Sequence, residues 1–336
     1  MKVVGLPLAL TMGEPAGIGG EIALKAWLGR ERGIPAFYMI DDPDRIAALA
    51  AELGWPAPVR AIERPAQACE IFAKALPVMP IGAVLRGRPG RPDPADARAI
   101  VDAIDAAVAD VRSGRAAALV TNPIHKDSLY RAGFRHPGHT EYLAELAGEG
   151  ATPVMMLVCP ELRVVPVTIH LALRRAAESL TAAAIVDAGR VAAAALRRDF
   201  GVAAPVLAIA GLNPHAGEAG ALGCEEIDII APAVAALRAL GIDARGPLAA
   251  DTMFHPEARR SYDAALCMYH DQALIPIKTI DFDGGVNVTL GLPFVRTSPD
   301  HGTAFAIAGR GVAREGSLVA ALRLAAEMAA RRRGPL

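Results

Sequence analysis

The chain has few aromatic residues, few cysteines and no excess of either charge. Only 4% of its 336 residues are Phe, Trp or Tyr, and 35 basic side chains against 36 acidic ones give a formal net charge of -1. This balance offers no electrostatic support for nucleic acid or a membrane surface as a partner. The four cysteines are scattered without a CxxC pair, as expected of a reduced, cytoplasmic protein.

Long apolar runs are also missing. Hydrophobic residues reach 53%, but much of this is alanine in segments that charges interrupt, and no stretch of about 18 apolar residues predicts a transmembrane helix. The apolar start superficially resembles a signal peptide. It is short and runs straight into a glycine motif, so a first buried strand fits better.

Apolar strand candidates alternate with amphipathic helix candidates along the whole chain, which predicts an α/β fold built from βα units. The length exceeds what one hydrophobic core usually supports, so two lobes are expected. We place the first, discontinuous lobe at 1–135 plus 286–336 and the second at 136–285. Strands are expected at 6–12, 36–40, 117–121, 154–159, 163–170, 205–210, 264–269 and 286–290, and the clearest helices at 94–112, 181–198 and 315–332.

Three of the apolar runs lead to a histidine: His170, His215 and His270. Buried parallel strands read as continuous apolar runs, and ligands of α/β folds bind beyond the carboxyl ends of such strands. Each histidine alone fits an ordinary loop or capping residue, but the shared context favours convergence on one metal ion. Because the histidines are far apart in sequence, the tertiary fold or a subunit interface must assemble the site.

Other polar residues fall in turns next to expected strands and helices. The glycine-rich segment 13–20 opens a helix but lacks the GxGxxG spacing, so it fits either an anion-binding turn or a plain tight βα turn. His139 and Thr140 begin another expected helix and are candidates for binding a carboxylate or phosphate, although Thr140 also fits an N-cap. Lys278, Asn287 and Arg296 provide the ammonium, amide and guanidinium donors that a phosphate needs.

Several longer motifs resemble the PdxA family of 4-hydroxythreonine-4-phosphate dehydrogenases. They are MMLV at 155–158, GLNPHAGE at 211–218, GPLAADT at 246–252, MYHDQ at 268–272 and GVNVTLGLPFVRTSPDHGT at 285–303. Segment 301–311 also resembles the adenine-nucleotide loop of isocitrate and isopropylmalate dehydrogenases. The resemblance therefore implies their fold, with two α/β/α lobes around a cleft.

The resemblance implies an enzyme of pyridoxal phosphate (vitamin B6) biosynthesis. It would oxidise 4-phosphooxy-L-threonine with NAD or NADP to 2-amino-3-oxo-4-phosphooxybutanoate, which loses carbon dioxide to give 3-amino-2-oxopropyl phosphate. Three neutral imidazoles would leave a divalent zinc, magnesium or cobalt ion with open positions for the substrate.

The resemblance also assigns residues of this chain to roles. His170, His215 and His270 match the metal ligands, with the third contributed across the interface of a homodimer, so that the second lobe carries metal ligands and dimer contacts. The general base stays open among Asp251, Lys278 and a metal-bound hydroxide. The remaining matches are the substrate-binding residues His139, Thr140, Lys278, Asn287 and Arg296, and the cofactor-binding residues Asp300, His301, Gly302 and Thr303.

Three positions depart from the family pattern. The glycine turn has Glu14 and Gly20 where aspartate and proline are usual, and Ala172 replaces a proline after the first ligand. These departures keep open a paralogue that oxidises D-threonate or D-erythronate 4-phosphate. Two alternatives of other classes are a phosphate acyltransferase, which needs neither metal nor nicotinamide, and a non-catalytic binding protein.

Overall fold

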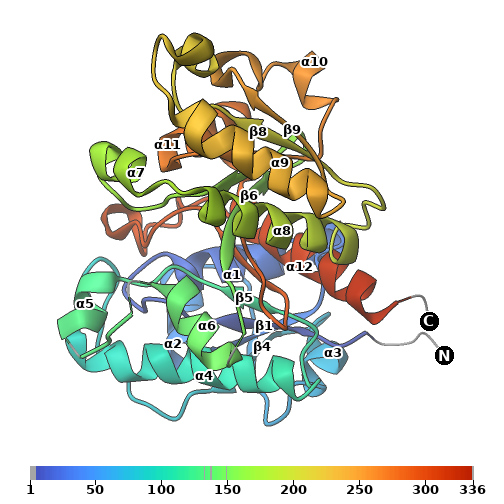
Figure 1. Cartoon of the computed structure of the whole chain (residues 1–336). Helices are drawn as coiled ribbons and strands as arrows, with labels where there is room; N and C mark the ends of the chain where they lie inside the picture. Colours follow the sequence, from blue (N-terminus) through green and yellow to red (C-terminus); the bar gives the residue numbers. More distant parts are fainter. Residues whose placement is uncertain (1–4, 132, 137, 149, 335–336) are drawn as a thin grey trace. The chain divides into compact units, whose positions relative to one another are not determined.

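The computed structural model describes residues 5–131, 133–136, 138–148 and 150–334, and the chain divides into two compact units (Figure 1). Unit 1 comprises 1–151 and 292–330, and unit 2 comprises 152–291 and 331–336. The first unit is discontinuous. The boundaries expected from the sequence, 135/136 and 285/286, differ from these because α6 (His139–Ala147) packs on unit 1 and β11 (Val286–Leu290) pairs with β6 of unit 2.

The sheet of unit 1 is entirely parallel. Its strands lie in the order β3-β4-β2-β1-β5-β12, and β1, β2, β5 and β12 are buried along their whole length. Burial on both faces explains why β1 and β2 read as unbroken apolar runs. The strands are β1 (Leu8–Thr11), β2 (Phe37–Asp41), β3 (Val59–Ala61), β4 (Leu76–Pro80), β5 (Leu119–Thr121) and β12 (Arg296–Pro299).

Two helical segments of unit 1 begin at aspartate caps. Asp42 caps α2 through its side chain, and a short 3-10 turn at Pro94–Asp96, capped by Asp93, leads into α4. The apolar face of α4 packs into the main core of this unit with residues of β1 and β2. The helices are α1 (Gly19–Leu28), α2 (Pro43–Glu52), α3 (Gln67–Ile71), α4 (Ala97–Arg112), α5 (Lys126–Arg131), α6 and the start of α12 (Gly316–Arg333).

The sheet of unit 2 is mixed, with the strand order β11-β6-β7-β10-β8-β9. The pairs β11-β6 and β6-β7 are antiparallel, whereas β7, β10, β8 and β9 run parallel to one another. The remaining strands are β6 (Val154–Cys159), β7 (Leu162–Pro166), β8 (Val206–Ala210), β9 (Asp243–Leu248) and β10 (Ala264–Cys267).

In unit 2, α8 and α9 lie side by side along the sheet (Figure 1). Thr181 caps α8 through its hydroxyl, which accepts a hydrogen bond from the N–H of Ala184. Among the described residues no single helix is long and apolar enough to cross a membrane, and the one pair that meets the criterion jointly, α7 with α8, is bent by 91°. The helices are α7 (Leu173–Ser179), α8 (Ala182–Arg198), α9 (Ala231–Ala239), α10 (Pro256–Arg259) and α11 (His270–Ile280).

Candidate functional site

The three histidines follow three neighbouring parallel strands of unit 2. Strands β7, β10 and β8 are adjacent in the sheet, so the connections that leave them emerge at one edge. Strands β7 and β10 end earlier than expected, at Pro166 and Cys267, whereas β8 ends at Ala210 as expected. His170 and His215 lie in the connections beyond their strands, and His270 is the first residue of α11.

His170 and His270 lie next to each other. Their ring centroids are 5.8 Å apart, and both line a pocket of about 230 Å³ together with Leu171, Tyr269 and Asp271. Asp271 places Oδ1 2.7 Å from Nδ1 of His270. A carboxylate at Nδ1 favours the tautomer that carries its proton there, which leaves Nε2 of His270 as the ligand atom.

His170 and His270 are placed as two ligands of one divalent metal ion would be, but the third predicted ligand is not beside them. Two imidazoles bound to one zinc ion at about 2.0–2.1 Å through nitrogen would have ring centroids roughly 5–6 Å apart, in the range of the observed separation. His215 does not join the pair, and no group of three His, Cys, Asp or Glu side chains suited to a metal occurs within the described part of one chain. One chain thus brings together two of the three predicted ligands.

Both His170 and His215 have left-handed backbone conformations, with φ of 50° and 51°. For residues with a side chain this region costs roughly 1–2 kcal/mol each, so the surroundings must enforce it. Such strain is concentrated at functional sites in proteins. The shared conformation is a signal of function at these two positions that the sequence alone did not give.

Buried Gln272 connects two of the histidine-bearing turns. Its Oε1 accepts a hydrogen bond from the backbone N–H of Met268 at 2.6 Å, and its Nε2 donates to the carbonyl oxygen of Gly211 at 2.7 Å. Met268 shortly precedes His270, and Gly211 begins the connection that contains His215. Gln272 thereby ties the two connections to each other.

The other unit 2 candidates differ in burial. Oδ1 of Asn287, on β11, is buried and has no hydrogen-bond partner among the described residues, so it is available to a ligand. Lys278 is half-buried on α11 with Nζ 5.5 Å from the ring centroid of Phe282. Asp251 is exposed in the short 3-10 turn Ala250–Thr252 that follows β9.

In unit 1, Arg296 is anchored on Thr121. The guanidinium donates to Oγ1 of Thr121 from Nη2 at 2.6 Å and from Nε at 3.2 Å, and the side chain is only 4% exposed. Burial lowers the pKa of Arg296 to about 10, which still leaves it charged at neutral pH. A buried, fixed cation of this kind suits a phosphate or carboxylate.

His139 lies within the electrostatic reach of Arg296. Burial, and then the charges of Arg296 and Lys126, lower the pKa of His139 well below its usual range. Its Nε2 is buried without a partner among the described residues. His139 is therefore a neutral imidazole at pH 7. Thr140, which follows it in the first turn of α6, makes no capping hydrogen bond to that helix, whose N-cap is Gly138.

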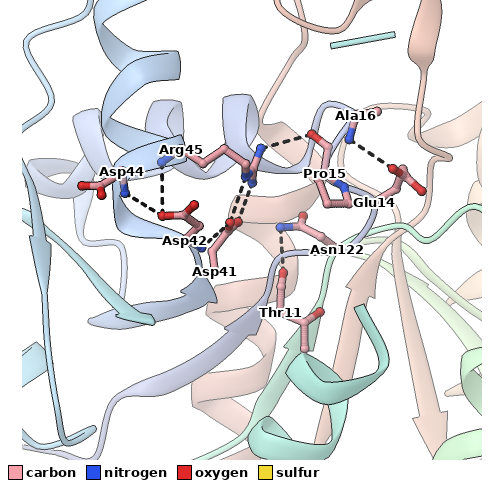
Figure 2. Close-up of polar contacts among 9 residues, drawn as sticks. All are labelled: Thr11, Glu14, Pro15, Ala16, Asp41, Asp42, Asp44, Arg45 and Asn122. Carbon is pink, nitrogen blue, oxygen red and sulfur yellow. Dashed lines mark hydrogen bonds and ion pairs between the residues drawn. The ribbon is translucent and has the colours of Figure 1, made fainter. Parts of the chain in front are cut away.

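The glycine turn of unit 1 and the strand before it are braced by Arg45 of α2 and by Asn122, which follows β5 (Figure 2). Arg45 pairs with Asp41 at 2.5 Å and donates to the carbonyl oxygen of Pro15 at 3.1 Å, and Asn122 donates to that of Thr11 at 3.1 Å. Gly13 has φ of 67°, and a Cβ there would lie 2.5 Å from the carbonyl oxygen of Pro123. Glycine is therefore required at this position.

Four N–H groups of this turn, those of residues 14, 16, 17 and 18, are already used. Ala16 donates to Oε1 of Glu14 at 3.2 Å (Figure 2), Gly17 donates to the carbonyl oxygen of Glu14, and Ile18 donates to that of Thr303. Of the two readings that the sequence left open, this favours a tight βα turn over an anion cradle. Oε2 of Glu14 is buried without a partner among the described residues, and burial raises the pKa of this carboxyl.

The predicted cofactor segment, Asp300 to Thr303, packs against the glycine turn through the hydrogen bond from Ile18 to Thr303. Glu21, which the sequence did not single out, holds the continuation of this segment, because its carboxylate accepts from the N–H groups of Gly309 and Ala313 at 3.1 and 3.0 Å. Nε2 of His301 is buried and has no partner among the described residues. The segment 300–313 and the glycine turn 13–20 are thus neighbours within unit 1.

Two departures from the family pattern have a local explanation. A Cβ on Gly20 would lie 3.1 Å from side-chain atoms of both Ile46 and Leu49, so its absence allows close packing of α1 against α2. Ala172 is the N-cap of α7 with φ of -58°, a value that proline also adopts. Neither departure removes a predicted ligand.

Comparisons with known proteins agree on one family. The family described as "Pyridoxal phosphate biosynthetic protein PdxA" matches residues 35–325. The 4-hydroxythreonine-4-phosphate dehydrogenase of Methylorubrum populi is 60% identical over 97% of this chain and 95% of its own, and that of Caulobacter vibrioides is 56% identical over 97% and 98%.

A solved structure extends this agreement to the fold. The crystal structure of the 4-hydroxythreonine-4-phosphate dehydrogenase from Klebsiella pneumoniae superimposes with a TM-score of 0.86 at 39% identity, covering 97% of this chain and 100% of that one. The predicted α/β fold and the predicted family are both confirmed. The chain belongs to the PdxA family of pyridoxal phosphate biosynthetic proteins.

Proposed function

We propose that this chain is a 4-hydroxythreonine-4-phosphate dehydrogenase of pyridoxal phosphate biosynthesis. It oxidises 4-phosphooxy-L-threonine with NAD or NADP to 2-amino-3-oxo-4-phosphooxybutanoate, which decarboxylates to 3-amino-2-oxopropyl phosphate. The observation that carries the proposal is the paired His170 and His270, at neighbouring parallel strands, in a chain 60% identical to a 4-hydroxythreonine-4-phosphate dehydrogenase.

His170, His215 and His270 would hold one zinc, magnesium or cobalt ion. When bound, this ion supplies positive charge that eases loss of the substrate hydroxyl proton and stabilises the enolate left by decarboxylation. Asp271 fixes the ring of His270 through Nδ1. The nicotinamide supplies the hydride acceptor, and we assign Asp300 to Thr303 to its binding.

His139, Thr140, Lys278, Asn287 and Arg296 would bind the phosphorylated substrate. Arg296 brings a charge that Thr121 already orients, so little side-chain freedom is lost on binding. Neutral His139 can donate a hydrogen bond to an anion without carrying a buried charge. Fixing the phosphate in this way aligns the remote C–H bond with its acceptor. Two side chains, those of Asp251 and Lys278, are candidates for the general base.

The pairing within one chain supports a site shared between two subunits of a homodimer. The resemblance implies that the second copy provides His270. Because His170 and His270 lie together within one chain, we propose instead that one chain provides these two histidines and a second copy provides His215. This can be tested with a heterodimer of His170→Ala and His215→Ala subunits, isolated through two different tags. A shared site predicts about half of the wild-type activity, because one site per heterodimer is then intact. No activity above that of either homodimeric variant would contradict this division of the ligands, and activity in a heterodimer of His170→Ala and His270→Ala subunits would show that His270 comes from the partner.

Substrate choice is tested by the rate of NADH or NADPH formation from three compounds: 4-phosphooxy-L-threonine, D-threonate 4-phosphate and D-erythronate 4-phosphate. The proposal predicts the highest kcat/KM for the threonine phosphate. Turnover of an aldonate phosphate alone would replace it with the paralogous activity. Formation of acyl phosphate from acyl-CoA and phosphate, unaffected by a chelator, would instead identify an acyltransferase.

A further inference from the structure

His215 begins a left-handed turn. The five consecutive residues from His215 to Ala219 all have positive φ, between 45° and 81°, and only Gly217 among them lacks a side chain. Isolated left-handed residues are common at helix ends, but a run of this length needs a strong local restraint. The hydrogen bonds within the run are sparse, since Ala216 donates to Asn213 and the next backbone bonds come from Ala221 and Leu222.

The restraint comes from Glu226, which is 3% exposed and starts a π-helical turn at Glu226–Ile230. Its Oε1 accepts from the backbone N–H groups of Leu212 and Asn213, both at 2.7 Å. Its Oε2 accepts from the side-chain amide of Asn213 at 2.9 Å. Three donors from the segment that leads into His215 thus converge on one buried carboxylate.

The carboxylate also fills the space inside the turn. A Cβ on Gly217 would lie 2.6 Å from Oε2 of Glu226, and one on Gly211 would lie 3.1 Å from Oε1. Burial raises the pKa of Glu226, but the hydrogen bonds from Asn213 and Leu212 outweigh this effect and hold the pKa below its usual value. Glu226 is therefore an ionised, fully hydrogen-bonded group around which the turn is folded.

We propose that Glu226 is a positioning residue that holds the left-handed turn of His215 in the conformation required for metal binding. This inference rests on the proposed function, because it takes His215 to be a metal ligand. Groups that orient metal ligands typically change metal affinity by about 10- to 100-fold when they are replaced. Glu226 contacts the connection on both sides of Pro214 and does not need to touch the ion.

The test uses the full-length protein, stripped of metal and titrated with Co²⁺ by isothermal calorimetry. Glu226→Gln keeps the size of the side chain but turns an amide donor toward the donors of residues 212 and 213. We expect the Kd for Co²⁺ to rise at least tenfold in Glu226→Gln. Asp228→Asn, an exposed position of the same π-helical turn, is the matched control and should bind like the wild type.

A second readout does not depend on the metal. In the metal-free proteins, hydrogen exchange of the backbone amides in 211–222 should be faster in Glu226→Gln and unchanged in Asp228→Asn. If Glu226→Gln is unstable, Asn213→Ala removes one donor to the same carboxylate and should show both effects at smaller size. Far-UV circular dichroism establishes that each variant is folded.

Wild-type Co²⁺ affinity in folded Glu226→Gln, or unchanged amide exchange at 211–222, would overturn the role of Glu226. His215→Ala separates this failure from failure of the proposed function. If His215→Ala binds Co²⁺ as tightly as the wild type does, the metal site itself is contradicted, and the role of Glu226 in it falls with it. Weakened binding in His215→Ala with normal binding in Glu226→Gln contradicts the positioning role alone.

Discussion

The side-chain amide of Gln272 donates a hydrogen bond to the carbonyl oxygen of Gly211 at 2.7 Å. Because the same side chain also accepts from Met268, one buried residue couples the connection before His270 to the connection before His215. The connections that carry the proposed metal ligands are thus held by a hydrogen-bonded side chain between them, as well as by the ends of their strands.

Replacing Gln272 by leucine should loosen both connections. The variant leaves the N–H of Met268 and the carbonyl of Gly211 without their partner, which should lower the free energy of unfolding by about 1–3 kcal/mol. The Kd for Co²⁺ should rise about tenfold or more. Urea unfolding and calorimetric titration measure the two effects, and Thr279→Ala on the exposed side of α11 is the control. Loss of stability with unchanged Co²⁺ affinity would limit Gln272 to a structural role.

Protonation of His139 should destabilise the folded protein. Its pKa is lowered in the folded state by burial and by Arg296 and Lys126, so the unfolded chain binds the extra proton more readily. The contribution of neutral His139 to the free energy of unfolding is therefore complete above about pH 6.5, the pKa of histidine in the unfolded chain. It is lost as the pH falls below this value, with a slope of up to about 1.4 kcal/mol per pH unit. Urea unfolding of the ligand-free protein between pH 5 and 8 measures this. His139→Gln should flatten the dependence, and an identical slope in that variant would show that other groups cause it.

Arg296→Lys should impair substrate binding more than it impairs folding. Lysine keeps the positive charge but cannot make the two guanidinium hydrogen bonds to Thr121, so the cation is no longer fixed. We expect KM for 4-phosphooxy-L-threonine to rise about 10- to 100-fold, equivalent to roughly 1.4–2.8 kcal/mol. Steady-state kinetics check this, with exposed Arg98→Lys as the control. An unchanged KM would remove Arg296 from the substrate site.

Ala172→Pro should stabilise the protein without changing its activity. The residue has φ of -58° at the N-cap of α7, which proline adopts without strain, and proline reduces the freedom of the unfolded chain. The gain should be about 0.4–1 kcal/mol in the free energy of unfolding. Urea unfolding measures it. A destabilised variant would mean that the connection after His170 cannot accept a proline ring in this chain.

The sequence predicts the buried strands well because burial on both faces leaves a plain apolar signal. Val154–Cys159 and Val286–Leu290 are strands with the expected bounds. Four strands, β3, β4, β9 and β12, were not predicted. β4 has the sequence LPVMP, in which two prolines weaken the strand signal. β3 and β9 are edge strands with polar residues facing outward, and β12, with the sequence RTSP, is buried but carries no apolar run.

The sequence predicts which residues belong to the site, but not their backbone conformations or the contacts that hold them. The repeated apolar run leading to a histidine identifies His170, His215 and His270, but it cannot reveal that the first two have left-handed backbones. Glu226 and Glu21 have no sequence signal of their own, because each acts by accepting backbone hydrogen bonds from segments that only the fold brings to it. Such contacts depend on tertiary structure and leave no periodic pattern.

The most direct test of the account is the rate of NADH or NADPH formation from 4-phosphooxy-L-threonine by protein stripped of metal with a chelator, before and after one equivalent of Zn²⁺, Mg²⁺ or Co²⁺ is restored. The account predicts at least a hundredfold loss of kcat in the stripped protein and recovery with at least one of the three ions. It also predicts no recovery in His170→Ala or His215→Ala. Full activity of the stripped protein would show that these histidines do not hold a catalytic metal ion.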